Sequence, residues 1–489
     1  MKRLEGMDAV FLHTESPTQY MHTLKIAIFD APEDGAAYSF QDQLAHIAST
    51  IHRVPPFRWK ALSIPLNIHH PLWMDDPDFD LALHVHRAAL PAPAGEKELS
   101  EFIENIASTP LNRDRALWEL WMVEGYQGDK VAAVSKVHHA LADGVGTAEL
   151  LEDFMTRKPG EDVPASTGSF GEQVPTRAAL AWSSVKDLVR DLGKIPGQIG
   201  RIRAAKKRRE ARNLPLQEQP PEPYTGPFTL LNGPLSSHRK FTFFTVPLED
   251  IKLIRKAFNT TINDVVLNMV AQALREYLQT RNALPSEPRN ATVPVSTRAP
   301  EKVHTYGNKV GSLCVSLCTD IEDTVQRLPA IHRAVEASKL EFEDTKGGRA
   351  ADFVGLLPPM AVRAIGSYSR RLSEQGKSPS FNVIVSNVPG PRQQLYDDYL
   401  PMREFYSIGP VLEGVGLNIT AWSFRDNLSF SVLSCYRAVP EPNEIRDSLL
   451  CAMQTMKTAA LASTREDEGE SKTVPDDEAP VDMTEHGEV

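Results

Sequence analysis

The sequence predicts an α/β protein with mixed sheets, built from two halves of similar size that a long crossover segment joins. Strand-like and helix-like segments alternate over residues 1–156 and again over residues 241–462, whereas residues 157–240 are polar, Pro-rich and basic. The alternation lacks the strict strand–helix–strand rhythm of a doubly wound parallel sheet, which favours mixed sheets. A chain of 489 residues has room for two or three domains.

In the N-terminal half, short apolar runs predict strands and longer periodic segments predict helices. Apolar, partly β-branched runs predict strands over residues 24–29, 118–126 and 131–137, the last two as a hairpin. Helical spacing of apolar residues predicts helices over residues 40–53, 99–111 and 145–155. The last of these helices should directly follow the hairpin.

The crossover segment begins as a Pro/Gly-rich loop and continues as a helical stretch. Aliphatic residues recur along this stretch at heptad-like spacing, namely Leu188, Leu192, Ile195, Ile199 and Ile202. We expect the helix to break at Pro196-Gly197. Residues 183–213 hold ten Lys and Arg against three acids, which makes this stretch strongly basic.

The C-terminal half repeats the α/β pattern and ends in an acidic tail. Apolar runs predict strands over residues 241–248, 308–317, 381–388, 415–424 and 428–437. Helical spacing predicts helices over residues 262–279 and 444–461. Residues 465–489 hold ten acids, two bases and few apolar side chains, so residues 463–489 should be disordered.

Charge and hydropathy argue against two classes of protein. The formal net charge is −11, and most of it lies in the acidic tail. The basic stretch has no interleaved aromatic residues and no nucleic-acid reader motif, so no nucleic-acid partner is expected. No run of about 18 apolar residues predicts a transmembrane helix, and no signal peptide is recognisable. Only four cysteines in this length favour a reducing, cytoplasmic location.

The most informative motif lies between the second hairpin strand and the helix expected after it. It contains His138, His139, Asp143 and Gly144 in the pattern HHxxxDG. Successive side chains of an extended segment point to opposite faces, so only one histidine should reach the reaction centre. An imidazole can take a proton near neutral pH. Asp143 can hold the loop or orient a ring, and Gly144 permits a close backbone approach.

This pattern resembles the HHxxxDG motif of the chloramphenicol-acetyltransferase-like acyltransferases. Further segments resemble, in the right order, those of the bacterial wax ester synthase/diacylglycerol acyltransferase family. They are residues 1–29, 71–73, 79–93, 117–119, 261–266, 294–298, 307–308 and 386–391. Ala116 stands where the family has a proline, which affects only the stiffness of that turn. The resemblance covers about residues 1–460.

The resemblance implies two chloramphenicol-acetyltransferase-like domains packed face to face, with the motif at their interface. It implies a long-chain acyl-CoA-dependent O-acyltransferase that makes triacylglycerol from diacylglycerol, and possibly wax esters from fatty alcohols. His139 is expected to be the general base and His138 a secondary residue. Coenzyme A enters as part of the acyl donor, and no metal or other cofactor is expected. The enzyme should be a monomer at a membrane or lipid-droplet surface.

Four residues outside the motif are candidates for supporting the site. Asn263 and Asp264 can cap a helix or, as the resemblance implies, support the active centre. Arg298 is a candidate partner for Asp143, because a buried carboxylate needs a compensating charge. Asn387 belongs either to a simple turn or, by resemblance, to a loop near the active centre.

Three questions stay open from the sequence. The chain can instead be another HHxxxDG thioester-using enzyme, such as a peptide-synthetase condensation domain. It can also be a non-catalytic protein that binds lipid surfaces. The basic helical stretch can pack between the two halves or lay its aliphatic stripe on a lipid surface with its cations toward anionic lipids.

Overall fold

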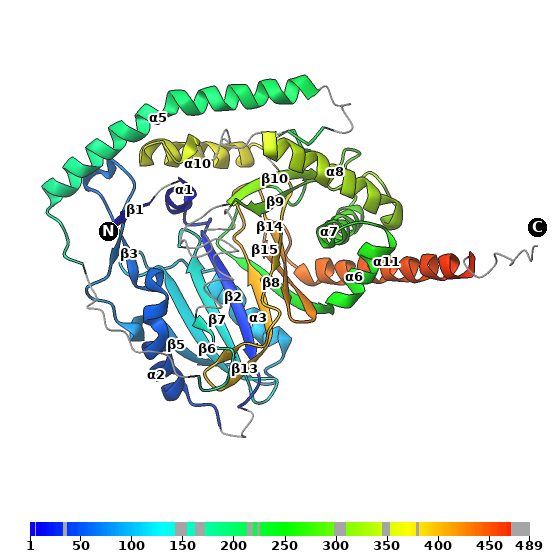
Figure 1. Cartoon of the computed structure of the whole chain (residues 1–489), viewed down its shortest axis with the longest axis horizontal. Coiled ribbons are helices and arrows are strands. Elements are labelled where there is room, and N and C mark those ends of the chain that lie inside the picture. The colour runs from blue at the N-terminus through cyan, green and yellow to red at the C-terminus, as the bar shows by residue number, and fades with distance from the viewer. Residues whose placement is uncertain are drawn as a thin grey trace, which may run out of the picture.

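The computed structural model describes residues 1–4, 6–32, 37–141, 154–161, 172–212, 219–222, 225–297, 310–344, 353–377 and 381–470, with side chains to residue 463. Two six-stranded mixed sheets lie side by side and helices pack around them (Figure 1). This arrangement confirms the predicted α/β class with mixed sheets. Every strand predicted from the sequence is present within a few residues of its expected bounds.

The first sheet carries the histidine motif at the end of one of its central strands. Its strands in order are β12 (Tyr396–Asp397), β13 (Leu400–Ile408), β2 (His22–Phe29), β7 (Lys130–His138), β6 (Trp118–Tyr126) and β5 (Val85–Ala89). Only β5 and β6 pair in parallel in this sheet, and β6 and β7 form the expected hairpin. One face packs under α2 (Phe40–Thr50), and the other packs against α3 (Glu96–Ala107) and the second sheet.

The second sheet forms the core of the C-terminal half. Its strands in order are β10 (Val310–Ser316), β9 (Asn290–Ser296), β11 (Val383–Pro389), β14 (Leu417–Phe424), β15 (Asn427–Cys435) and β8 (Arg239–Pro247). The strand β11 is parallel to both of its neighbours. The helices that pack against this sheet are α6 (Leu248–Ala257), α7 (Ile262–Gln279), α8 (Thr324–Asp344) and α11 (Pro442–Glu470). The strongly apolar α7 is the most deeply buried of them.

One hairpin crosses between the two halves. The strands β12 and β13 come from the C-terminal half of the chain, but β13 pairs with β2 of the first sheet. The ring of Phe405 on β13 then contacts Trp422 on β14, with 4.9 Å between centroids, and so ties the two sheets together. A boundary near residue 240 therefore divides the chain into two halves, but the first large sheet contains strands from both halves.

Smaller elements close the molecule around the end of β7. A third sheet contains β1 (Lys2–Arg3), β4 (Leu72–Asp75) and β3 (Trp59–Leu62). Short 3₁₀ turns span Ile51–Arg53, Pro55–Arg58, Pro65–Asn67 and Leu81–Leu83. The helix α1 (Gly6–Thr14) packs against α10 (Pro359–Glu374) of the other half. No helix in the described part of the chain is both long and apolar enough to cross a membrane.

The crossover contains one long helix, α5 (Arg177–Arg212), which runs along the outside of the molecule above α10 (Figure 1). The predicted break at Pro196 is wrong, because the helix continues through it. A proline at this position cannot donate to the Leu192 carbonyl. Both residues lie on the exposed side of α5, where water can satisfy that carbonyl. The helix expected at residues 145–155 lies almost wholly outside the described residues.

Candidate functional site

His138 and His139 stand where the central strand β7 ends. The His139 N–H donates to the Met21 carbonyl at 2.7 Å, which extends the β2–β7 ladder one residue past its last strand pair, His22 and His138. The strand alternation therefore continues through both histidines, and their rings lie on opposite faces of the sheet. The His138 side chain is buried, whereas His139 is partly exposed.

The His138 ring is used inside the protein. Its Nδ1 accepts a hydrogen bond from the Ala140 N–H at 3.0 Å, so Nδ1 carries no proton. In the neutral ring the proton is then on Nε2, which lies 3.8 Å from Oε1 of Glu15. His138 thus holds the turn that follows β7 through Nδ1, and its buried Nε2 faces Glu15.

Glu15, which the sequence did not single out, is the carboxylate beneath this turn. Its Oε1 accepts the Met21 N–H at 3.3 Å, and its Oε2 accepts the Arg113 Nε–H at 2.9 Å. Burial alone would raise the pKa of Glu15, but the hydrogen bond and charge of His138 and the charge of Arg113 lower it to about 2. Glu15 is therefore a carboxylate at all pH values at which an enzyme works. A lone acid in the N-terminal segment gives no sequence signal for this role.

Met21 links Glu15 to His139 through its backbone. Its N–H donates to Glu15, and its carbonyl accepts from the His139 N–H. The His139 ring also lies against Phe11 of α1, with 4.4 Å between ring centroids. Since α1 packs against α10 of the C-terminal half, His139 stands close to where the two halves meet.

A second pair, His69 and His70, is structural. The Nε2 of His70 lies 3.2 Å from the Gly355 carbonyl, and burial together with the neighbouring His69 lowers the pKa of His70 to about 4. His69 faces Asp191 of α5 at 3.3 Å. Within the described ranges, no cluster of three or more His, Cys, Asp or Glu has a geometry that could hold a metal ion.

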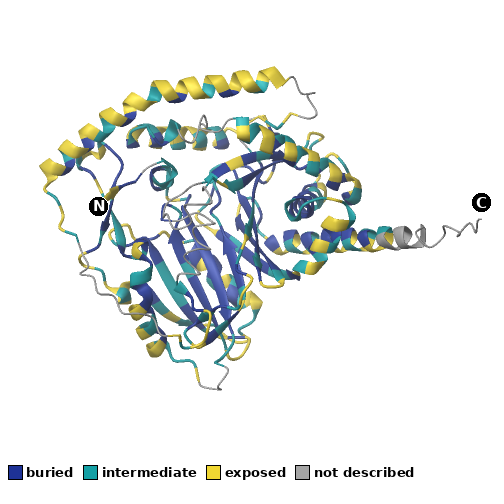
Figure 2. Cartoon of the chain, viewed as in Figure 1, coloured by how far each residue is buried: buried dark blue, intermediate teal, exposed yellow. Residues whose placement is uncertain are grey.

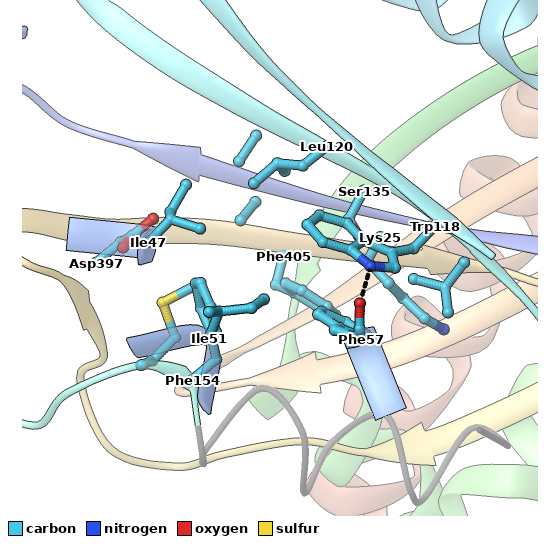
Figure 3. A pocket seen from close by; sticks show the side chains of 14 residues that line it. Lys25, Ile47, Ile51, Phe57, Trp118, Leu120, Ser135, Phe154, Asp397 and Phe405 are labelled. Carbon is cyan, nitrogen blue, oxygen red and sulfur yellow. Dashed lines mark hydrogen bonds between the residues drawn. The ribbon is translucent and has the colours of Figure 1, made fainter. Parts of the chain in front are cut away.

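An apolar pocket lies on the face of the first sheet that His139 shares. The pocket lies between the first sheet and α2 (Figure 3). It contains about 790 Å³ of empty space, part of which is open to solvent. Ala133, Ser135 and Val137 of β7 line it, and they alternate in step with His139. The other lining residues are Lys25, Ala27, Ile47, Ile51, Phe57, Trp118, Leu120, Phe154, Met155, Asp397 and Phe405.

The few polar groups of this pocket lie at its two ends. Lys25 and Ser135 stand at one end with Trp118, and Asp397 stands at the other (Figure 3). Lys25 donates to the Ser407 hydroxyl at 2.6 Å. Burial raises the pKa of Asp397, although His46 at 3.7 Å acts in the opposite direction. The long middle of the pocket is aliphatic and aromatic, which suits a hydrocarbon chain.

The remaining candidates have mixed outcomes. Asp143, Gly144 and Arg298 lie outside the described residues. Asp264 is the third residue of α7, and it forms a capping box with Thr261: each side chain accepts the other's backbone N–H. Its other recorded partner is His332 Nδ1, at 2.7 Å. Thr261, rather than Asn263, is thus the N-cap.

Asn387 lies near the end of β11, where it pairs in register with Ala421 of β14. It is part of the strand, and the Pro-Gly-Pro turn begins two residues later. The side chain is partly exposed. The expected support of the site by Asn263, Asp264 and Asn387 stays a prediction.

Comparison with known proteins identifies similar chains of the same length. The profile described as the wax ester synthase/diacylglycerol acyltransferase catalytic domain matches residues 4–266, and that of the corresponding C-terminal domain matches residues 306–457. A Mycobacterium tuberculosis protein with the assigned name diacylglycerol O-acyltransferase is 35% identical over 470 residues, which cover 94% of this chain and 97% of the relative.

Solved structures give the same result. The wax ester synthase/diacylglycerol acyltransferase from Marinobacter aquaeolei VT8 is similar with a TM-score of 0.68 and 27% identity, over 94% of this chain and all of the other. The first condensation domain of the CDA synthetase has a TM-score of 0.59 at 16% identity, over 94% of this chain and 96% of the domain. The second likeness shows a shared fold, with the two-domain architecture expected from the HHxxxDG pattern.

Proposed function

We propose that this chain moves a long fatty acyl group from coenzyme A to the free hydroxyl of a diacylglycerol. The chain belongs to the wax ester synthase/diacylglycerol acyltransferase family and is therefore an acyltransferase. The observation that carries this proposal is the apolar pocket on the sheet face of His139. Fatty alcohols are a second acceptor class, because the Marinobacter protein is named a wax ester synthase as well.

In the proposed reaction, His139 removes the proton from the acceptor hydroxyl while its oxygen attacks the thioester carbonyl. The carbon–oxygen bond forms and the carbonyl becomes a tetrahedral oxyanion. When the oxyanion collapses, the carbon–sulfur bond breaks and coenzyme A leaves as a thiolate. A thiol of pKa about 8.5 leaves readily, so the proton on His139 can return to the sulfur or to water. Asp143 and Gly144 are expected to shape the loop beside this base.

The pocket supports an acyl-chain site by its length as well as its polarity. Ala133 lies six residues before His139, which is about 20 Å along an extended strand. Each lipid chain fills half of a hydrocarbon core about 30 Å thick, or about 15 Å. The row of pocket residues Ala133, Ser135 and Val137, which leads toward His139, therefore supports a long acyl chain between the sheet and α2.

The test of this function uses the purified protein with palmitoyl-coenzyme A and a panel of acceptors, and it measures thiol release and the lipid product. We expect turnover with diacylglycerol and with long-chain alcohols. Thiol release with amino-acyl acceptors alone would favour a condensation-type enzyme. Absence of transfer to every acceptor, despite binding of the acyl donor or of lipid vesicles, would favour the non-catalytic alternative.

The pocket itself makes a specific prediction about chain length. Ala133 is small, lines the pocket and lies on the His139 face. Ala133→Phe should fill the pocket and reduce kcat/KM for palmitoyl-coenzyme A by roughly 10–100-fold, while butyryl-coenzyme A should still react. Ala133→Ser, which leaves the space open, is the matched control. Equal losses for both donors in Ala133→Phe would show that the acyl chain lies elsewhere.

A further inference from the structure

The long helix α5 is attached to the protein through polar contacts. Its buried residues are Leu180, Ser184, Asp191, Gln198 and Ala205, and the last four are spaced seven apart, so they form one face of the helix. Arg3 donates to the Ser184 hydroxyl at 3.1 Å. Near the other end of α5, Arg212 pairs with Asp344 of α8 at 2.7 Å. The helix therefore bridges the two halves of the chain with a packed face that carries both polar and apolar side chains.

A set of apolar side chains of α5 points away from the protein. We call Trp182, Val185, Val189, Leu192, Pro196 and Ile199 the outer stripe, and their spacing of three and four residues places them on one face. Trp182 is 66% exposed, Val189 is 65% exposed, and the other aliphatic members are 37–41% exposed. Figure 2 shows that α5 is exposed along nearly its whole length. An ordinary surface helix has the opposite arrangement, with its apolar stripe toward the core.

The structure shows how the aliphatic residues of this segment are distributed around the helix. Of the aliphatic residues in the expected heptad, Leu188, Ile195 and Ile202 are half-buried along the edge of the packed face. Leu192 and Ile199 belong to the exposed outer stripe. The helix bridges the two halves through its packed face, and it still presents an apolar face of about 26 Å in length to the outside.

The basic residues near the C-terminal end of α5 fall into two groups with different surroundings. Arg208 donates to the Asp344 carbonyl, and Arg209 pairs with Glu341 of α8 at 3.3 Å, so these two fasten the helix. Arg203, Lys206 and Lys207 are exposed and lie on the same side as the outer stripe, just beyond Ile199. Over the whole helix, eleven Lys and Arg face only three acids, in a chain whose net charge is −11.

A second exposed apolar side chain stands on the 3₁₀ turn that contacts α5. Leu66 of this turn is 89% exposed. Its backbone is held at a φ of +59°, a left-handed conformation that is uncommon for a leucine. Leu66 is thus a further exposed apolar side chain on an element next to α5.

We propose that the outer stripe, together with Arg203, Lys206 and Lys207, is the face by which this enzyme docks on an anionic lipid surface. The proposal deepens the proposed function, because a diacylglycerol must be collected from a membrane or a lipid droplet. A tryptophan at one end, aliphatic residues along the middle and cations on the same side are the features of a helix that lies in a lipid interface. A second protein copy would not need this one-sided excess of positive charge, which anionic headgroups complement.

The test compares flotation of the full chain with anionic vesicles of phosphatidylglycerol and phosphatidylcholine. Trp182→Ser with Val189→Ser should weaken binding about tenfold or more. Arg203→Gln with Lys207→Gln should weaken it roughly 25-fold at low salt, at about fivefold per cation, and should flatten its salt dependence. The matched controls are Leu83→Ser with Leu461→Ser, and Arg87→Gln with Lys97→Gln, at exposed sites away from α5. These controls should bind as the parent does.

The rate of acyl transfer to a short, water-soluble alcohol separates this inference from the proposed chemistry. That rate should stay unchanged in the two α5 variants and in their two controls. Vesicle binding that persists in both α5 variants overturns the docking face and leaves the chemistry intact. A parent dimer that becomes a monomer in Trp182→Ser with Val189→Ser, without any vesicle, shows a self-association face and also overturns it. If the parent transfers no acyl group but the vesicle results hold, the chemistry fails and the docking face stands.

Discussion

His139→Ala should reduce turnover of palmitoyl-coenzyme A with diacylglycerol by about 10²–10⁴-fold, the usual contribution of a general base. The expectation rests on the geometry of the turn after β7. His139 is partly exposed, stands near the junction of the two halves and shares the sheet face of the apolar pocket. The loss should appear in kcat, because the acyl chain still enters the same pocket.

His138→Ala is the informative comparison for this variant. His138 is buried, and its Nδ1 accepts the Ala140 N–H, so its removal should lower the melting temperature more than His139→Ala does. Melting curves and initial rates for both variants separate the two roles. A His138→Ala enzyme that loses turnover without any loss of stability, beside a nearly active His139→Ala enzyme, would reverse the assignment.

Local sequence patterns predict the helices and strands well, because each type of element has its own spacing of apolar residues. The helix over residues 262–279 was predicted with the bounds of α7, since its apolar residues repeat at helical spacing and a Thr precedes it as N-cap. The opposite orientation of His138 and His139 followed from strand alternation alone. Both inferences depend on the chain within a few residues of the feature, which is what a single sequence records.

Long-range placement was not predictable in the same way. Nothing in residues 400–408 indicates that β13 joins the sheet of β2, almost 380 positions earlier, rather than its own half. The break expected at Pro196 is wrong, because the energetic cost of a proline in a helix depends on whether water can solvate the carbonyl that loses its hydrogen bond. Glu15 escaped notice because its role comes from Arg113, Met21 and His138, which only folding brings to it.

Glu15→Gln should reduce kcat by roughly 10–100-fold with little change in the KM for the acyl donor. Glu15 does not line the pocket. Its carboxylate accepts the Met21 N–H, and the Met21 carbonyl accepts the His139 N–H. A displacement of about 1 Å at a reacting group can cost about a hundredfold in rate. Glu15 is thus a positioning residue, and a purely structural role would lower the amount of folded enzyme without this split between kcat and KM.

The same variant has a predictable dependence on pH. The pKa of Glu15 in the folded protein is lowered from 4.5 to about 2, so the charged form stabilises the fold above pH 4.5. That contribution, on the order of 3 kcal/mol, is lost as the pH falls from 4.5 toward 2. The gap in stability between parent and Glu15→Gln should therefore shrink as the pH falls from 4.5 toward 2.

Glu124→Gln is the matched control, because Glu124 forms a similar two-bond pair with Arg87 on the exposed edge of the first sheet. Solvent screens that pair, so its loss should change neither kcat nor the pH dependence of unfolding. Chemical denaturation at several pH values, with initial rates at saturating donor, measures both properties of each variant. If Glu15→Gln behaves like Glu124→Gln in both, the turn that carries His139 is held by its own backbone, and the link through Met21 contributes nothing to catalysis.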